Sequence, residues 1–291
     1  MQAHAICLAI VPSTFFATTS NDNLKSVQQS IRGNVMTPNS STEHPPSAGT
    51  ERKKVALVMG AGNAIGSAIG TKFAETGLTV CLARRHGELL ADRVSALRER
   101  GLEAHGFSCG TRKEDQVEEL FAHIEQDIGE LEVVVFNVGA NVPMSLLQTS
   151  SQKFIKMWEM ACFGGFLTGR EAARKMLPRK RGTILFTGAT ASTRGGANFA
   201  AFASAKHGLR ALAQSMAREL GPQNIHVAHV IIDAAVDTPW IREHHPSYQK
   251  LNNQEGIVKP EELAKSYVML HQQNRTAWTF ELDVRPWIER W

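Results

Sequence analysis

Seven consecutive residues that begin at Gly60 constrain the fold of this chain more than any other stretch. The sequence Gly-Ala-Gly-Asn-Ala-Ile-Gly, residues 60–66, follows a largely apolar run over 53–59 and precedes a helix-like pattern. That order predicts a strand, a tight turn and a helix start, where the backbone can approach a pyrophosphate held by free helix amides. The residues expected to bind a dinucleotide here are Gly60, Gly62, Asn63, Ile65 and Gly66.

Apolar runs and helix-period segments alternate along the rest of the chain. The strand-like runs lie near 78–83, 103–109, 131–138, 182–187, 225–232 and 277–283, and the helix-like segments near 87–100, 113–128, 150–177, 199–220 and 260–272. This alternation predicts βαβ units and a parallel sheet that is covered on both faces. The expected fold class is α/β, a single Rossmann-like doubly wound domain over 51–291 with a seven-stranded parallel sheet.

Two arginines indicate which dinucleotide would bind. Arg84 and Arg85 end the second strand-like run, about 20 residues past the glycines, where a Rossmann fold places the partner of the adenosine ribose. An acid at this point would accept from a 2′-hydroxyl and favour NAD(H). A guanidinium suits a 2′-phosphate better, so the expected cofactor is NADP(H) rather than NAD(H).

From Lys53 to the C-terminus the chain resembles the short-chain dehydrogenase/reductases. The glycine motif of that family falls on Met59, Gly60, Ala64 and Gly66, its Asn-Asn-Ala-Gly motif on Phe136-Asn137-Val138-Gly139, and its late helix start on 259–264. The resemblance implies that Asn137, Gly139, Lys206 and Thr238 also contact the cofactor. It further implies a homodimer or homotetramer formed through the two long helices near 150–177 and 199–220, whose small residues would permit close packing.

The same resemblance implies a catalytic set of Asn, Ser, Tyr and Lys, and most of that set is missing. In the family, tyrosine is the general acid/base, lysine lowers its pKa and holds the nicotinamide ribose, serine binds the substrate oxygen, and asparagine maintains a proton path. The lysine falls on Lys206, but the tyrosine falls on Phe202, the serine on Ala189 and the asparagine on Ala161. Lys206 therefore fits a ribose ligand better than half of a proton relay.

Several residues are candidates for the missing proton donor. Tyr248, with His244 and His245, lies in the stretch 238–260 where the family places its substrate lid, although such loops are often only solvated. Asp233 would act as an acid if burial raised its pKa, whereas a cap or loop hydrogen bond would make it structural. A third possibility is a substrate that needs no acid, such as an iminium ion or an activated alkene.

Two functions follow from these residues. One is an NAD(P)(H)-dependent oxidoreductase that transfers hydride to or from a small organic substrate, with a proton donor other than tyrosine or with none. The other is a catalytically silent NADP(H)-binding sensor or scaffold protein. Both predict cofactor binding, and we favour the enzyme because Lys206 and the tyrosine-bearing lid are what a working site would need.

Composition argues against other classes of partner. The net charge is +4, but the basic residues are scattered and no nucleic-acid motif is present, so no nucleic acid is expected. No apolar run reaches the roughly 18 residues of a spanning helix, and the 4 cysteines lack metal-like spacing, so neither a membrane nor a metal is expected.

Residues 1–50 differ from the rest, since they are rich in Ser, Thr, Asn and Pro. That composition predicts a disordered extension on a cytoplasmic protein. A secretory or organellar leader over 1–35 is the alternative, as is a true start at Met36.

Overall fold

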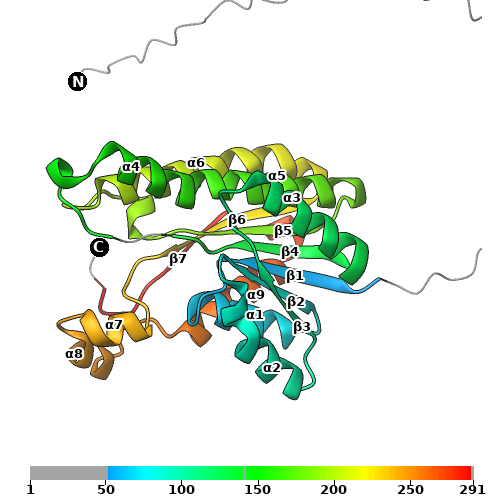
Figure 1. Cartoon of the computed structure of the whole chain (residues 1–291), viewed down its shortest axis with the longest axis horizontal. Coiled ribbons are helices and arrows are strands. Elements are labelled where there is room, and N and C mark those ends of the chain that lie inside the picture. Colours follow the sequence, from blue (N-terminus) through cyan, green and yellow to red (C-terminus); the bar gives the residue numbers. More distant parts are fainter. Residues whose placement is uncertain (1–51, 140–141, 290–291) are drawn as a thin grey trace, which may run out of the picture. The chain divides into compact units, whose positions relative to one another are not determined.

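The computed structural model describes residues 52–139 and 142–289, and the predictions for residues 1–50 lie outside them. Within the described residues a seven-stranded parallel sheet runs in the order β3-β2-β1-β4-β5-β6-β7. Helices cover both of its faces (Figure 1). The predicted fold class is confirmed.

The elements follow the alternation seen in the sequence. The strands are β1 (Lys54–Met59), β2 (Thr79–Arg84), β3 (Ala104–Ser108), β4 (Glu130–Phe136), β5 (Gly182–Thr187), β6 (Ile225–Ile232) and β7 (Glu281–Val284). The helices are α1 (Ile65–Ala74), α2 (Ala91–Glu99), α3 (Glu114–His123), α4 (Ser151–Trp158), α5 (Gly164–Met176), α6 (Ala200–Leu220), α7 (Pro239–His244), α8 (Tyr248–Asn253) and α9 (Pro260–Gln272). The last strand begins later than predicted, at Glu281, and 275–277 form a 3₁₀ turn before it.

Strand β1 explains why the apolar run is continuous rather than alternating. Ala56 and Val58 face one core cluster with α1 and α9, while Val55 and Leu57 face the other with α3, α5 and α6. Side chains alternate between the faces of a strand, so a sheet buried on both faces needs apolar residues at every position. Figure 1 shows α1, α2 and α9 on one side of the sheet and α3 to α6 on the other.

The strand order fixes where a ligand can enter. Strand β1 lies between β2 and β4, so the chain leaves β1 toward one edge of the sheet and later returns to its other side. At such a reversal the connecting loops diverge and open a crevice at the carboxyl ends of the strands. The glycine turn after β1 and the loop after β4 therefore frame one site.

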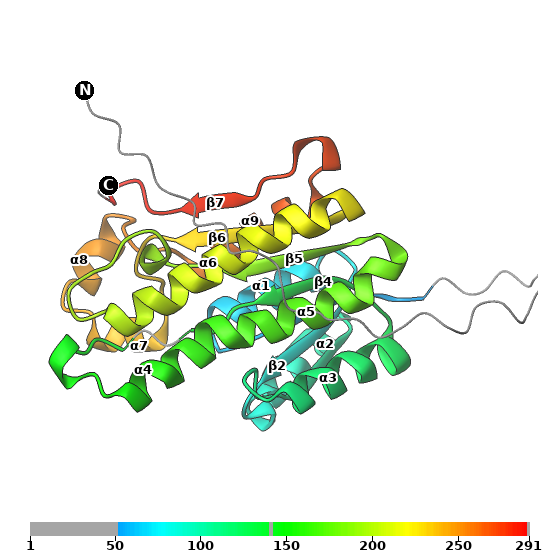
Figure 2. The same cartoon turned by 90° about the horizontal axis from the view of Figure 1, so that it is seen from above.

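Helices α4 and α5 follow each other end to end, and α6 runs alongside them (Figure 2). Most of the small residues that suggested an oligomer interface pack inside the chain, although Ala211 is exposed. A Cβ at Gly164 would meet Thr111, and one at Gly165 would meet Leu209. Ala205 is likewise buried. The prediction of a homo-oligomer therefore has to rest on other features of these helices, namely the exposed apolar side chains Ile155, Trp158 and Phe166.

No helix among residues 52–139 and 142–289 has the length and apolar character required to cross a membrane.

Candidate active site

The glycine turn is held by close approaches that only glycine permits at two of its three positions. A Cβ at Gly60, whose φ is +85°, would lie 2.5 Å from the Asn137 carbonyl oxygen, and one at Gly66 would lie 2.6 Å from the Gly60 carbonyl oxygen. Gly62 differs, because no described atom lies within 4 Å of its Cβ position. Gly60 and Gly66 are therefore required by packing, whereas Gly62 leaves room for a ligand.

The start of α1 is open toward the same space. Ala64 is the residue before the helix and forms no side-chain cap. The Ser67 amide donates to the Gly62 carbonyl oxygen at 3.1 Å, which leaves the Ile65 and Gly66 amides of the first turn for a ligand. Asn137, at the end of β4, donates from Nδ2 to the Gly60 carbonyl oxygen at 3.1 Å and steadies the turn. Ile65, the first residue of α1, lines an apolar cavity with Asn137.

A cationic cavity of about 460 Å³ lies beside the glycine turn. Gly60, Gly62, Arg84 and Arg85, four of the residues that the sequence predicts to bind the cofactor, line it. Arg84 donates to Asn63 Oδ1 at 3.2 Å and so ties the end of β2 to the turn. None of the described residues that line it is a carboxylate. A phosphate group is the complement of such a wall.

Three further basic residues of this cavity were missed by the sequence reasoning: His86, Arg112 and Lys113. His86 follows β2, and the other two lie in the turn after β3. A signal was available, because the carboxyl ends of neighbouring parallel strands meet at one edge of a sheet. Arg112 is already 3.1 Å from Glu159 Oε2, so its charge is partly offset.

An apolar cavity of about 270 Å³ continues from the cationic one. Asn137, Val138 and Gly139 line both cavities, which therefore meet at the loop after β4. The walls of the apolar cavity are Ile65, Thr187, Gly188, Ala189, Phe202, Lys206, Ile232, Ala234 and Val236. One titratable side chain, that of Lys206, is among these described lining residues.

Lys206 is buried on the inner face of α6. Its Nζ donates to the Thr187 carbonyl oxygen at 2.8 Å and to the Val138 carbonyl oxygen at 3.2 Å. It lies 6.0 Å from the centre of the Phe202 ring, and no described carboxylate forms an ion pair with it. Burial disfavours the charged form and lowers the pKa of Lys206 to about 8.

Apolar side chains occupy the positions of the missing catalytic residues. Phe202 is one turn before Lys206 and is 7% exposed, and Ala189 lines the apolar cavity after β5. Ala161 is buried in a π-helical turn, η4 (Glu159–Phe163), between α4 and α5. Such turns are frequent at functional sites, and here the backbone feature persists without a polar side chain.

The hypothesis that burial raises the pKa of Asp233 is wrong. Burial does oppose the charged form, but hydrogen bonds from Thr190 and Arg194, with the charges of Arg194 and Arg285, lower the pKa on balance. Arg194 contacts both carboxylate oxygens, at 2.9 and 3.0 Å, and Thr190 donates at 2.6 Å. Asp233 is thus an anchored carboxylate that joins the loops after β5 and β6, which matches its structural alternative.

The lid residues are tied to Asp237. Tyr248 donates to Asp237 Oδ1 at 3.0 Å, Arg242 donates to the same oxygen at 2.6 Å, and Lys259 donates to Oδ2 at 2.8 Å. The Arg242 hydrogen bond is the largest of the effects that hold the pKa of Asp237 below its usual range. Tyr248 does not line the cavity that contains Lys206, so its predicted role requires the lid to move.

Other lid residues form hydrogen bonds and ring contacts with residues close to them in the sequence. Thr238 Oγ1 accepts from the Ile241 amide at 3.1 Å and caps α7, so the structure gives this predicted cofactor ligand a structural partner. His244 bonds to the Trp240 carbonyl oxygen and stacks on its ring, while His245 Nδ1 accepts from the Ser247 amide. Neither histidine lines the apolar cavity.

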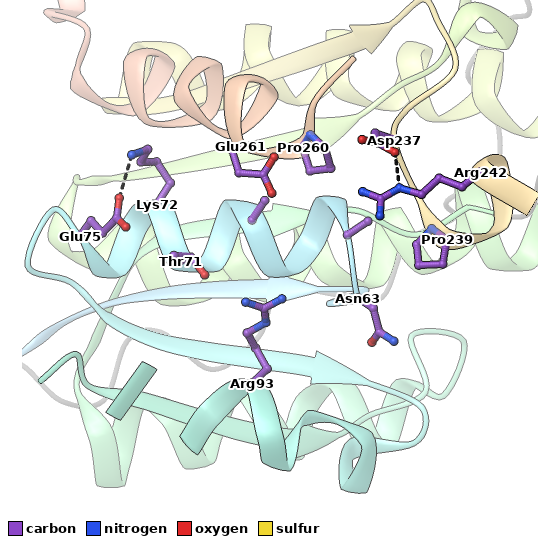
Figure 3. A pocket seen from close by; sticks show the side chains of 12 residues that line it. Asn63, Thr71, Lys72, Glu75, Arg93, Asp237, Pro239, Arg242, Pro260 and Glu261 are labelled. Carbon is purple, nitrogen blue, oxygen red and sulfur yellow. Dashed lines mark hydrogen bonds and ion pairs between the residues drawn. The ribbon is translucent and has the colours of Figure 1, made fainter. Parts of the chain in front are cut away.

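A third cavity, of about 340 Å³, runs along the outer side of α1 (Figure 3). Its charges are of both signs and largely paired, as in Lys72 with Glu75 and Arg242 with Asp237. It shares no lining residue with the other two cavities. Its lining includes Asp237 and Arg242 at the base of the lid and Arg93 from α2, and it is separate from the cationic and apolar cavities.

Among the described residues, no group of three or more His, Cys, Asp or Glu side chains could hold a metal ion. Cys81, Cys109 and Cys162 are buried free thiols.

Comparison with known proteins places this geometry in a family. Residues 54–248 match the family model described as short chain dehydrogenase. The 3-oxoacyl-[acyl-carrier-protein] reductase MabA of Mycobacterium bovis is 30% identical over 64% of this chain and 70% of its own length.

Solved structures agree with that match. A short-chain dehydrogenase from Rhodopseudomonas palustris is 48% identical, with a TM-score of 0.69 over 80% of this chain and 99% of its own. An actinorhodin polyketide ketoreductase solved with NADPH is 25% identical, with a TM-score of 0.73 over 80% of this chain and 96% of its own. This chain belongs to the short-chain dehydrogenase family.

Proposed function

We propose that the protein is an NADP(H)-dependent oxidoreductase that transfers hydride between the nicotinamide and a small, largely apolar organic substrate. One observation carries the proposal: a cationic cavity and an apolar cavity meet at Asn137, Val138 and Gly139, beside the glycine turn. NADP(H) would fit this arrangement, because its phosphates suit the cationic cavity and its nicotinamide suits the apolar cavity.

The residues present suit NADP(H) rather than NAD(H). Arg84, Arg85 and Lys113 line the cationic cavity, and the two arginines would bind the ribose 2′-phosphate. The helix start and Gly62 would receive the pyrophosphate, and Lys206 would contact the nicotinamide ribose. The related polyketide ketoreductase that was solved with NADPH supports this cofactor. The bound cofactor would supply the hydride.

The apolar cavity supports a small substrate with little charge. Phe202, Ile232 and Val236 form much of its wall, and its volume of about 270 Å³ is modest. A carbonyl compound, an iminium ion and an activated alkene all fit this chemistry. The 3-oxoacyl reductase among the relatives favours a carbonyl group.

A second candidate function is supported by the apolar replacements at Phe202, Ala189 and Ala161. With the family's polar groups missing, the chain would bind NADP(H) and signal or scaffold without turnover. Oxidation of NADPH, followed against panels of carbonyls, iminium ions and activated alkenes, separates the two functions. Tight binding with no turnover on any panel would favour the silent protein.

The cofactor preference is tested by replacing both Arg84 and Arg85 with Gln. Each charge-assisted hydrogen bond to a phosphate contributes about 1.5–3 kcal/mol. We therefore expect the NADPH affinity to fall by about 10-fold to 100-fold for each bond that is lost. The NADH affinity should stay nearly constant, and fluorescence titration measures both. Arg93→Gln is the matched control, because Arg93 lines only the cavity of Figure 3. Equal losses for NADPH and NADH would refute the assignment of the arginines.

A further inference from the structure

The apolar cavity contains two polar side chains besides Lys206, and both are engaged elsewhere. Asn137 Nδ2 donates to the Gly60 carbonyl oxygen at 3.1 Å. Thr187 Oγ1 is 2.7 Å from the Tyr267 hydroxyl on the far side of β5. A substrate bound in this cavity would therefore meet Lys206 as its one ionisable neighbour among the described lining residues.

The Lys206 ammonium has one proton left for that substrate. An ammonium group carries three protons, and two of them are directed at the carbonyl oxygens of Val138 and Thr187. A Cβ built on Gly139 would lie 3.5 Å from Lys206 Nζ and 3.9 Å from Phe202 Cε2. Lys206 and the Phe202 ring edge thus border the same space above Gly139.

The described charged groups near Lys206 form ion pairs with one another and not with Lys206. His229 on β6 is fully buried, Glu281 on β7 accepts from it at 3.1 Å, and Arg210 on α6 donates to Glu281 at 2.6 and 2.7 Å. Burial lowers the pKa of His229 to about 4, so this ring is neutral at pH 7. Beyond the end of β6, Asp233 is paired with Arg194.

The remaining ionisable groups near Lys206 titrate at higher pH or lie outside the cavity. Burial raises the pKa of the Cys162 thiol beside α6 and of the Tyr267 hydroxyl behind β5. His207, the next residue on α6, is exposed and bonds to the Ala203 carbonyl oxygen. Lys206 therefore has no counter-charge of its own, which favours release of a proton from Nζ.

We propose that Lys206 takes over the missing tyrosine's role as the general acid of the reduction and, in reverse, as the general base of the oxidation. This inference rests on the proposed function, in which a carbonyl carbon would receive hydride from bound NADPH and the C=O bonding pair would move to oxygen. Lys206 Nζ then loses one proton, directly or across one water molecule, to form the O–H bond. The lysine is left neutral inside an apolar wall and regains its proton from solvent.

The first test compares two kinds of probe, small aryl ketones such as 1-phenyl-1,2-propanedione and iminium ions such as N-methyl-3,4-dihydroisoquinolinium. General acid catalysis contributes roughly 10² to 10⁴-fold, and only the ketone needs it. With saturating NADPH, Lys206→Met should lower ketone reduction at least about 100-fold. Iminium reduction should fall by about 10-fold at most, the part that a weaker hold on the ribose explains.

The matched control is Lys206→Arg, which keeps a positive charge and hydrogen-bond donors but cannot release a proton near neutral pH. Its ketone reduction should be as low as that of Lys206→Met. Ketone reduction by the native protein should decline as pH rises through about 8, where Lys206 loses its proton, and iminium reduction should not. Thermal unfolding and NADPH titration identify any variant that fails to fold.

The second test reads Lys206 without turnover. Reductive ¹³C-methylation of the lysines, with Lys206→Met to assign the signal, gives an NMR titration of Nζ in the complex with NADP⁺. A midpoint within about one unit of 8 supports the proposal, and a group that stays protonated beyond pH 10 overturns it.

The outcomes also separate this inference from the proposed function. Reduction of the iminium ions but of no ketone, or equal losses on both probes in Lys206→Met, overturns the role of Lys206 and leaves the oxidoreductase standing. Turnover of no member of either class overturns both.

Discussion

The two ends of the groove that we propose for the cofactor are built in opposite ways. At the proposed adenosine end, Arg84 is the last residue of β2, and Arg85 and Lys113 lie on the loops after β2 and β3, so three positive charges lie where water reaches them. At the proposed nicotinamide end, Phe202 and Ala189 stand at the positions of the family's polar groups, and Lys206 is the one ionisable side chain among the described residues that line the apolar cavity. The adenosine end can gain or lose a charge with little effect on the stability of the fold. At the nicotinamide end, the only formal charge among the described lining residues of the apolar cavity is on the buried Lys206 Nζ.

This difference indicates which parts of the family's machinery are separable. In the proposed site, cofactor binding depends on backbone geometry at the glycine turn and on charge near the surface, and neither depends on the identity of residue 202. In the proposed mechanism, the chemistry depends on the protonation state of Lys206, and the apolar surroundings of this side chain control that state. A chain can therefore keep the cofactor site and change the proton donor.

The largest expected effect comes from the glycine turn that both ends share. In Gly66→Ala the new methyl group would lie 2.6 Å from the Gly60 carbonyl oxygen and 2.7 Å from the Ala61 Cα. Backbone atoms cannot move aside as a side chain can, so we expect a loss of about 3 kcal/mol or more in the free energy of unfolding. Urea denaturation measures it.

The matched variant is Gly62→Ala, whose methyl group would meet no described atom within 4 Å. Its stability should change by no more than about 0.5 kcal/mol, yet NADPH affinity should fall because the methyl group enters the space of the pyrophosphate. If Gly62→Ala binds NADPH as tightly as the native protein does, the cofactor does not pass this glycine.

The second effect belongs to the nicotinamide end alone. The pKa of Lys206 is about 8 in the folded protein against 10.5 for the free side chain. Below pH 8 both states carry the proton. Between pH 8 and 10.5 the Lys206 side chain is protonated in the unfolded state and neutral in the folded state. Over this range Lys206 therefore makes the free energy of unfolding rise with pH, by about 3 kcal/mol in total. In Lys206→Met that rise should be missing.

The measurement is urea denaturation at pH 7.5 and 10.5 for both proteins without cofactor. Other groups that titrate in this window are the same in both, and they cancel in the difference. Lys265→Met is the control, because Lys265 is on the surface and 58% exposed. Parallel pH dependences for the native protein and Lys206→Met would mean that the buried ammonium has an ordinary pKa.

The glycine turn and the arginines after β2 could be predicted from the sequence because their geometry is local. Residues 60–66 specify a turn through their own backbone requirements, and Arg84 follows from a short count along one βαβ unit. The basic residues at 112 and 113 were within reach of the same reasoning, since parallel strands end at one edge.

The reaction end could not be predicted in the same way. The pairing of Asp233 with Arg194 joins residues 39 positions apart, and no spacing rule connects them. Whether a carboxylate near the cofactor has a raised or a lowered pKa depends on that partner, so the sign of the shift is a tertiary property. The same holds for Tyr248, whose partner Asp237 is set by how the lid folds back.

The smallest expected effect tests whether the lid belongs to the reaction end. Tyr248→Phe removes one of three donors to Asp237 and leaves Arg242 and Lys259 in place. One hydrogen bond to a carboxylate that keeps two cationic partners contributes about 1 kcal/mol, so the unfolding free energy should fall by that amount or less. NADPH oxidation should be unchanged on every substrate that the native protein reduces, because Lys206 faces the cavity and Tyr248 does not. A loss of ketone turnover of about 100-fold or more in Tyr248→Phe, with unchanged NADPH binding, would instead make the lid tyrosine the donor and reduce Lys206 to a ribose ligand.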